Sequence, residues 1–318
     1  MSRSNPLNTR NQTGAPTPGS NGNYNADMSD TLQRFIFEHA PIRGELVQLA
    51  ATWQAVTERH TYPLPLRKVL GELMAAGALL AATLKFEGTL ILQLHGNGPV
   101  KLIVVESAAG HAMRATAKWD GDIPDGNLRT LLGNGRFVIN LVPESGQQTY
   151  QGIVDLHADS VAAALEHYMA TSEQIETRLW LACDDQRAAG LLLQKLPEHE
   201  TVDADAWPRI GHLAATVQPQ ELLALAPRDL LHRLFHEEDL RVFEPRPVFF
   251  RCSCSRERVT GMLRMLGRDE VRGVIAERGE VEVHCEFCNR RYALDAIDAE
   301  EIFAAAVTVA APAKKTRH

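Results

Sequence analysis

Between residues 28 and 197 the hydrophobic and polar positions follow two patterns. Helical spacing marks residues 49–60, 64–85 and 160–173, and the second stretch is entered at Pro63 and Pro65 and has an interior of Ala, Leu and Met, so we expect it to be buried. Strand-like stretches, some separated by Gly-Asn-Gly turns, lie at residues 89–95, 100–106, 112–119, 136–142, 150–156, 175–183 and 190–196. Helices beside meandering strands predict an α+β core domain of mainly antiparallel sheets over residues 28–197.

Residues 198–247 have a different character, because repeated prolines divide them into short helices. These helices are amphipathic, and their apolar positions are Leu222, Leu223, Leu225, Leu230, Leu231, Leu234 and Phe235. Each apolar face must pack against another part of the protein. We interpret the segment as a helical connector between domains. If the domain after it unfolded, the connector would loosen and expose apolar surface, although ordinary core packing explains any single leucine better.

The two ends of the chain differ from its interior. Residues 1–27 are rich in Asn, Gly, Ser, Thr and Pro, which predicts a disordered tail, and residues 307–318 predict a short flexible tail that is basic at its end. The longest apolar run, residues 73–84, is shorter than the roughly twenty residues that cross a bilayer, and no secretion signal is recognisable. We therefore expect a cytoplasmic protein with no membrane partner.

The chain contains five cysteines, four of which form two tight pairs, Cys252 with Cys254 and Cys285 with Cys288. In a cytoplasmic protein such clustering indicates a metal site rather than a disulfide framework. Zn²⁺ prefers four soft ligands in a tetrahedron, so we expect these four thiolates to bind one Zn²⁺ per chain in the reduced state. The fifth cysteine, Cys183, ends a predicted strand and is expected to be a buried core thiol.

Spacing alone leaves two interpretations of the zinc site open. A disulfide across the single residue between Cys252 and Cys254 would be strained and easily reduced, which suits a reversible switch. Nearby Arg251, Arg256 and Arg258, with a helix expected to open after Cys254, would favour the thiolate. A permanent structural zinc site fits the same spacing equally well.

The predicted zinc domain, residues 248–306, holds few large apolar side chains and is too small to be stable on its own core. Its metal would therefore supply folding free energy, on the order of 10 kcal/mol for structural zinc. Oxidation of the thiolates would release the ion and remove an amount comparable to the stability of a typical domain.

Charge and motifs disfavour two other classes of function. The net charge is −7, and residues 251–295 hold nine arginines against eight Asp and Glu, so nucleic acid is not an expected partner. The chain lacks a phosphate-binding Gly-x-x-x-x-Gly-Lys loop and a Gly-x-Ser-x-Gly elbow, so we do not expect an enzyme. The alternatives kept are an enzyme, or a transcription or translation adaptor, with a permanent zinc site.

Several motifs resemble one family over nearly the whole chain after the N-terminal tail. They lie at residues 30–38, 42–47, 84–88, 96–99, 132–135, 172–174 and 234–238, with the specific zinc signatures Cys-Ser-Cys-Ser-Arg-Glu-Arg at 252–258 and His-Cys-Glu-Phe-Cys at 284–288. The chain resembles the redox-regulated bacterial heat-shock chaperonin, the 33 kDa chaperonin family. Two features depart from the family pattern: the polar tail before Met28, and the fifth cysteine, Cys183.

The resemblance implies a holdase chaperone of the oxidative stress response, which is inactive when reduced and bound to zinc. It implies that oxidation pairs Cys252 with Cys254 and Cys285 with Cys288, releases zinc, and unfolds the zinc domain and the connector. The resemblance further implies that the oxidised chain forms a homodimer and captures unfolding client proteins without ATP.

Overall fold

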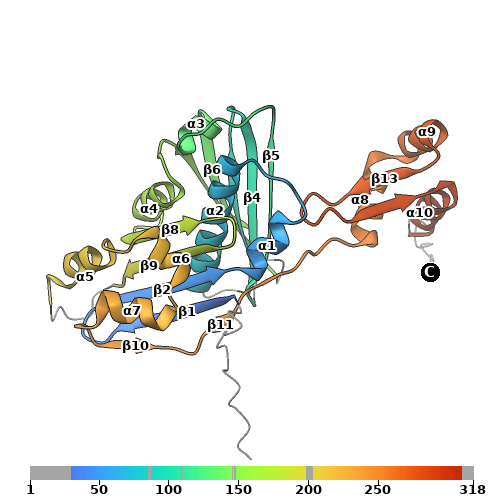
Figure 1. Cartoon of the computed structure of the whole chain (residues 1–318). Helices are drawn as coiled ribbons and strands as arrows, with labels where there is room; N and C mark the ends of the chain where they lie inside the picture. Colours follow the sequence, from blue (N-terminus) through green and yellow to red (C-terminus); the bar gives the residue numbers. More distant parts are fainter. Residues whose placement is uncertain are drawn as a thin grey trace, which may run out of the picture.

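The computed structural model describes residues 30–84, 87–108, 110–144, 146, 148–197 and 203–309. The predicted N-terminal tail and the last nine residues of the C-terminal tail lie outside the described residues. A large body carries two sheets of six strands each, and a smaller unit projects from its side (Figure 1). No helix in the described ranges is long and apolar enough to cross a membrane.

The first sheet has the strand order β10-β1-β2-β9-β8, with β11 also paired to β1, and all its pairs are antiparallel. Its strands are β1 (Thr31–Phe37), β2 (Ile42–Leu49), β8 (Thr177–Cys183), β9 (Ala188–Lys195), β10 (Leu240–Val242) and β11 (Arg246–Pro247). The sequence predicted β8 and β9, but it predicted neither β1 and β2 nor the two short strands contributed by the connector.

The second sheet has the order β12-β5-β4-β3-β6-β7. Its strands are β3 (Gly88–His95), β4 (Val100–Ala108), β5 (Ala112–Trp119), β6 (Gly135–Pro143), β7 (Tyr150–Leu156) and β12 (Phe249–Phe250). Strands β3 to β7 confirm the predicted meander and pair antiparallel, whereas β12 pairs parallel to the edge strand β5. The predicted α+β class with mainly antiparallel sheets is confirmed.

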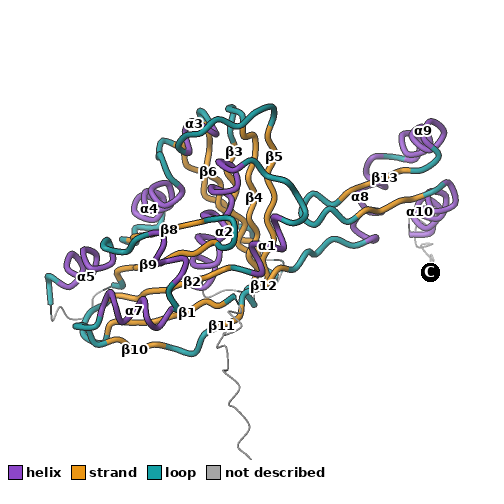
Figure 2. Tube along the Cα trace, in the orientation of Figure 1, coloured by secondary structure: helices purple, strands orange, loops and turns teal. Residues whose placement is uncertain are grey.

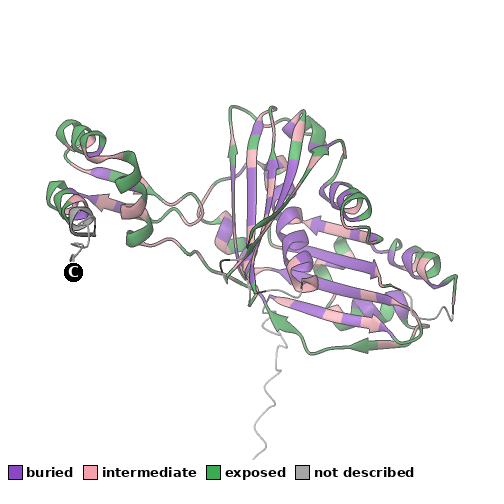
Figure 3. Ribbon diagram, turned by 180° about the vertical axis from the view of Figure 1, so that it is seen from behind, coloured by how far each residue is buried: buried purple, intermediate pink, exposed green. Residues whose placement is uncertain are grey.

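Helix α2 (Leu64–Thr83) packs against strands of both sheets and is buried along most of its length, as predicted (Figure 3). Small residues allow this close packing: a Cβ on Gly77 would lie 3.0 Å from Val105, and Leu79 approaches Gly190 of the first sheet. The remaining helices of the core are α1 (Ala51–Thr57), α3 (Leu128–Leu132) and α4 (Val161–Thr171).

The other face of the first sheet is covered by the helices of the connector, α5 (Ala206–Ala214), α6 (Pro219–Ala224) and α7 (Pro227–Phe235). The buried residues of this second core include Phe35, Phe37, Ile42 and Leu46 from the sheet and Leu222, Leu230, Leu231, Leu234 and Phe235 from the helices. The predicted docking of these apolar faces is confirmed. After α7 the chain is extended and runs along the edges of both sheets: the connector forms β10 and β11, and the residues directly after it form β12 (Figure 2).

The projecting unit contains the hairpin β13 (Val281–His284) and β14 (Arg291–Leu294) and the helices α8 (Arg256–Leu266), α9 (Arg268–Arg278) and α10 (Ala296–Val309). Its buried residues are Leu263, Val271, Val281, Tyr292, Leu294, Ala299 and Ile302. A core of this size is small for an independently stable unit, so a further source of folding free energy is needed.

Candidate metal centre

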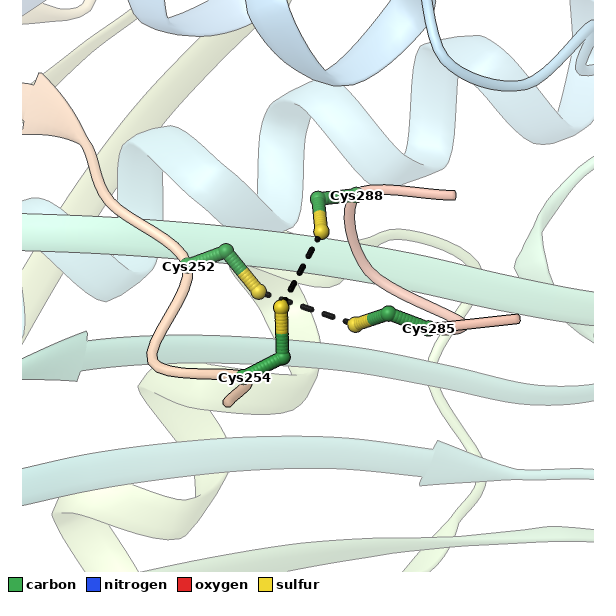
Figure 4. Close-up of side chains that lie close together, drawn as sticks. All are labelled: Cys252, Cys254, Cys285 and Cys288. Carbon is green, nitrogen blue, oxygen red and sulfur yellow. Dashed lines mark hydrogen bonds between the residues drawn. The ribbon is translucent and has the colours of Figure 1, made fainter. Parts of the chain in front are cut away.

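The four paired cysteines converge on one point at the end of the small unit that faces the large body (Figure 4). Cys252 and Cys254 lie between β12 and α8, and Cys285 and Cys288 lie in the turn between β13 and β14. The Sγ atoms of Cys252 and Cys285 are 3.6 Å apart and those of Cys254 and Cys288 are 3.4 Å apart. All four lie within 4.8 Å of one another.

Local structure fixes both pairs. The Ser255 side chain accepts a hydrogen bond from the backbone N–H of Arg258 and so caps α8 directly after Cys254, as the sequence predicted. In the second pair, Asn289 donates its backbone N–H to the carbonyl of Cys285 at 2.8 Å and adopts a φ of 56°, a conformation that Asn tolerates better than most residues. Two tight turns thus present four sulfurs to one centre.

The arrangement suits a tetrahedral thiophilic cation. Sulfurs bound at about 2.3 Å to one Zn²⁺ would be about 3.8 Å apart, close to the separations observed. Four thiolates this near one another repel, and burial together with the neighbouring thiols raises the pKa of Cys288 to about 12. A divalent cation would compensate this charge, so the donor set fits zinc.

The thiol of Cys254 is an exception within the cluster. Burial opposes its ionisation, but hydrogen bonds outweigh this effect and lower its pKa to about 7. The main donor is the Tyr292 hydroxyl of β14, 3.1 Å from the Cys254 sulfur. A hydroxyl aimed at a ligand sulfur orients that ligand, as the outer partners of metal sites do.

Two of the three arginines expected to favour the thiolates take other partners, and so does His284, which directly precedes Cys285. Arg258 donates to the Ser253 hydroxyl at 2.7 Å, Arg256 pairs with Asp298 at 2.6 Å, and His284 pairs with Glu282 at 2.5 Å, which raises the pKa of His284. The guanidinium that reaches the centre belongs to Arg114 of β5, whose Nη1 is 3.8 Å from the Cys252 sulfur. No motif or spacing in the sequence indicated this contact.

Cys183 lies on β8 in the large body, outside the cluster of four. It packs against the main core, as predicted, but it is half-buried rather than buried, and its Sγ lies 3.3 Å from the carbonyl of Asp184. Burial, with the nearby carboxylates of Glu72 and Asp184, raises its pKa strongly, so this thiol is a poor nucleophile at neutral pH.

Comparison with known families agrees with this architecture. Residues 30–295 match the family model described as Hsp33 protein, a span that includes both sheets, the connector and all four clustered cysteines. The chain belongs to the Hsp33 family. The resemblance drawn from the motifs is therefore confirmed, and with it membership of a chaperone family.

Named relatives match nearly the whole chain. The 33 kDa chaperonin of Chromobacterium violaceum is 52% identical over 296 residues, covering 92% of this chain and 100% of that protein. The 33 kDa chaperonin of Methylobacillus flagellatus is 49% identical over 293 residues, covering 92% and 99%. The crystal structure of the 33 kDa chaperonin from Thermotoga maritima has a TM-score of 0.77 at 23% identity, covering 87% and 99%, and shows that the fold is shared.

Proposed function

We propose that the chain is a redox-regulated holdase that needs no ATP and binds unfolding client proteins when oxidised. The observation that carries the proposal is the position of the four-thiol cluster at the end of the connector: Cys252 follows β12 by two residues. A chemical change at these sulfurs therefore acts directly on a segment that lies along both sheets and covers an apolar core.

In the reduced state Cys252, Cys254, Cys285 and Cys288 would hold one Zn²⁺, whose charge lets four thiolates remain together. The ion would also contribute folding free energy to a unit whose own core is small. A reducing cytoplasm would maintain this inactive form.

Oxidation would convert the four thiols into two disulfides, Cys252 with Cys254 and Cys285 with Cys288. Each pair of thiolates would give two electrons to one peroxide molecule, which takes up protons and leaves as two waters. Hypochlorite would accept the same two electrons and leave as chloride and water. The sulfur contacts of 3.6 Å and 3.4 Å join one pair to the other, so the proposed disulfides would replace these contacts by bonds within each pair.

Loss of the thiolate donors would unfold the small unit and free the connector from the sheet edges. The face beneath α5 to α7 is apolar and carries two buried phenylalanines, Phe35 and Phe37. Exposed, such a face would bind unfolded proteins and a second copy of the chain, consistent with a homodimer in the oxidised state.

The test follows zinc release with a colorimetric chelator while the reduced protein is treated with peroxide or hypochlorite. Suppression of the aggregation of a thermally unfolding client, and the sedimentation coefficient, are measured on the same samples. We expect about one zinc per chain to be released together with client protection and dimer formation, all reversed by dithiothreitol and zinc. If the oxidised protein retains its zinc, or releases it without suppressing the aggregation of the client, the site is a permanent structural one and the proposal is overturned.

A further inference from the structure

The small unit that holds the four cysteines, here called the zinc-binding unit, contacts the edge of the second sheet through hydrogen bonds and side chains as well as through the covalent chain. Phe249 and Phe250 pair parallel with Ala112 and Met113 of β5, and the backbone N–H of Arg251 donates to the carbonyl of Met113 at 2.9 Å. Beyond this pairing, two outward-facing side chains of β5 reach the cysteine loops. The core sheet thus holds the metal centre from outside the unit that contains it.

The first of these side chains, Arg114, is held in place by its neighbour on β4. Its Nε and Nη2 atoms both lie 2.7 Å from Oε2 of Glu106, and the two side chains are only 15% and 20% exposed. Charge-assisted hydrogen bonds of this kind fix the direction of a guanidinium. Nη1 remains available and points to the Cys252 sulfur at 3.8 Å.

The guanidinium of Arg114 also contacts the second cysteine loop. Its central carbon lies 4.0 Å from the centroid of the Phe287 ring, between Cys285 and Cys288 in sequence, in a cation–π arrangement. The adjacent residue, Glu286, pairs with Lys118 of β5 at 2.5 Å. Arg114 therefore touches one residue from each cysteine loop, whereas Lys118 adds a more exposed ion pair.

We propose that Arg114 is a positioning residue that couples the oxidation state of Cys252 to the docking of the zinc-binding unit on β5. A thiolate accepts the guanidinium hydrogen bond well, whereas a sulfur in a disulfide with Cys254 has lost its negative charge and accepts poorly. Oxidation therefore weakens the dock, and by linkage the dock must favour the reduced form. This inference rests on the proposed function and names a residue of the core domain that sets how readily the switch responds.

The test compares Arg114→Ala, Arg114→Lys and Glu106→Gln with Arg136→Ala. Arg136 lies on β6 of the same sheet, pairs in register with His95 rather than with β5, and is exposed, so it controls for loss of a surface cation. Two quantities are measured on the full chain: the rate of peroxide-driven zinc release and the thiol–disulfide equilibrium in glutathione buffers. The second quantity would not change if Arg114 only stabilised the core.

We expect Arg114→Ala to release zinc about three- to tenfold faster and to shift the equilibrium toward the disulfides by a similar factor, as for loss of one ordinary hydrogen bond. Arg114→Lys should have an intermediate rate and equilibrium, because lysine keeps the positive charge but lacks the planar set of donors of the guanidinium. Glu106→Gln should have a similar intermediate effect. Arg136→Ala should match the wild type.

A charge exchange tests the second contact independently. Lys118→Glu and Glu286→Lys should each speed zinc release by about twofold or less, as expected for an exposed pair, and the double variant should restore the wild-type rate. If the wild type releases zinc on oxidation but the Arg114 variants show the same release rate and thiol–disulfide equilibrium as Arg136→Ala, the coupling is overturned and the proposed function remains intact. A wild type that releases no zinc would overturn both.

Discussion

Phe37 of β1 and Phe235 of α7 pack edge to face, with ring centroids 5.2 Å apart and an angle of 84° between the ring planes. Phe35 adds a third ring, whose centroid is 6.1 Å from that of Phe235. Aromatic pairs of this geometry contribute more than their buried area alone. The cluster therefore fastens the last helix of the connector to the first sheet.

Replacing Phe235 by alanine should loosen the connector. Removing a buried phenylalanine costs about 3–5 kcal/mol, and here the loss falls on a helix of nine residues, Pro227–Phe235, rather than on the main core. We expect faster hydrogen exchange in α7 and, under the proposed function, client protection by the reduced protein with zinc still bound. His232→Ala, on the exposed face of the same helix, is the matched control. Unchanged exchange in α7 would contradict this prediction.

Replacing Cys285 by serine should abolish stable zinc binding. Serine is a poor zinc ligand at neutral pH, and three thiolates leave the tetrahedron incomplete. Because the small core would depend on the metal under the proposed function, we expect loss of helix content in circular dichroism from the small unit, while the large body still melts cooperatively. Metal analysis gives the stoichiometry. Cys183→Ser, outside the cluster, should retain one zinc per chain, and zinc loss in that variant would count against the assignment.

The cysteine spacing predicted the cluster of four thiols because its members come in pairs that are close in sequence. Arg114 was not foreseen, since it lies 138 residues before Cys252 on a strand whose alternation of exposed and buried positions looks ordinary. A contact between two units that are far apart in the sequence does not change the hydrophobic and polar pattern of either segment. Domain boundaries drawn from composition likewise remain predictions.

The same contrast holds for the fold. Strands β3 to β7 were predicted because apolar and more polar residues alternate along each of them. β2 was missed because both of its faces are covered, so its pattern of burial from Ile42 to Leu49 is nearly continuous and includes Glu45 and Gln48. β10 to β12 span only two or three residues each, and their pairing depends on edges formed elsewhere in the chain.

The stability of the core should fall as the pH rises from about 4.5 to 7. Glu45 is fully buried, lies 3.5 Å from Arg34, and has no hydrogen bond to either carboxylate oxygen, and burial raises its pKa to about 7. Between the unfolded and folded pKa values the native state binds more protons than the unfolded state, so deprotonation destabilises it, by at most about 3 kcal/mol. Glu72 should act in the same direction, because burial also raises its pKa to about 7.

Urea unfolding at pH 5 and pH 8, followed by tryptophan fluorescence, measures this dependence. Glu45→Gln cannot ionise and should reduce the loss of stability between the two pH values, with the remainder due partly to Glu72. Glu58→Gln, at the exposed end of α1, should leave the wild-type dependence unchanged. Stability that rises with pH in this window, or an equal slope in Glu45→Gln, would contradict the prediction.

Replacing Tyr292 by phenylalanine should weaken zinc binding without disturbing the small core. The ring of Tyr292 is 6% exposed and belongs to that core, and phenylalanine keeps its packing while removing the hydroxyl 3.1 Å from the Cys254 sulfur. Loss of such an outer partner lowers metal affinity about 10- to 100-fold. Competition with a chromophoric chelator at fixed pH measures the change. The control Tyr292→Leu removes the aromatic ring as well and should add a loss of thermal stability. Equal zinc affinity in Tyr292→Phe and the wild type would show that the hydroxyl does not support the Cys254 ligand.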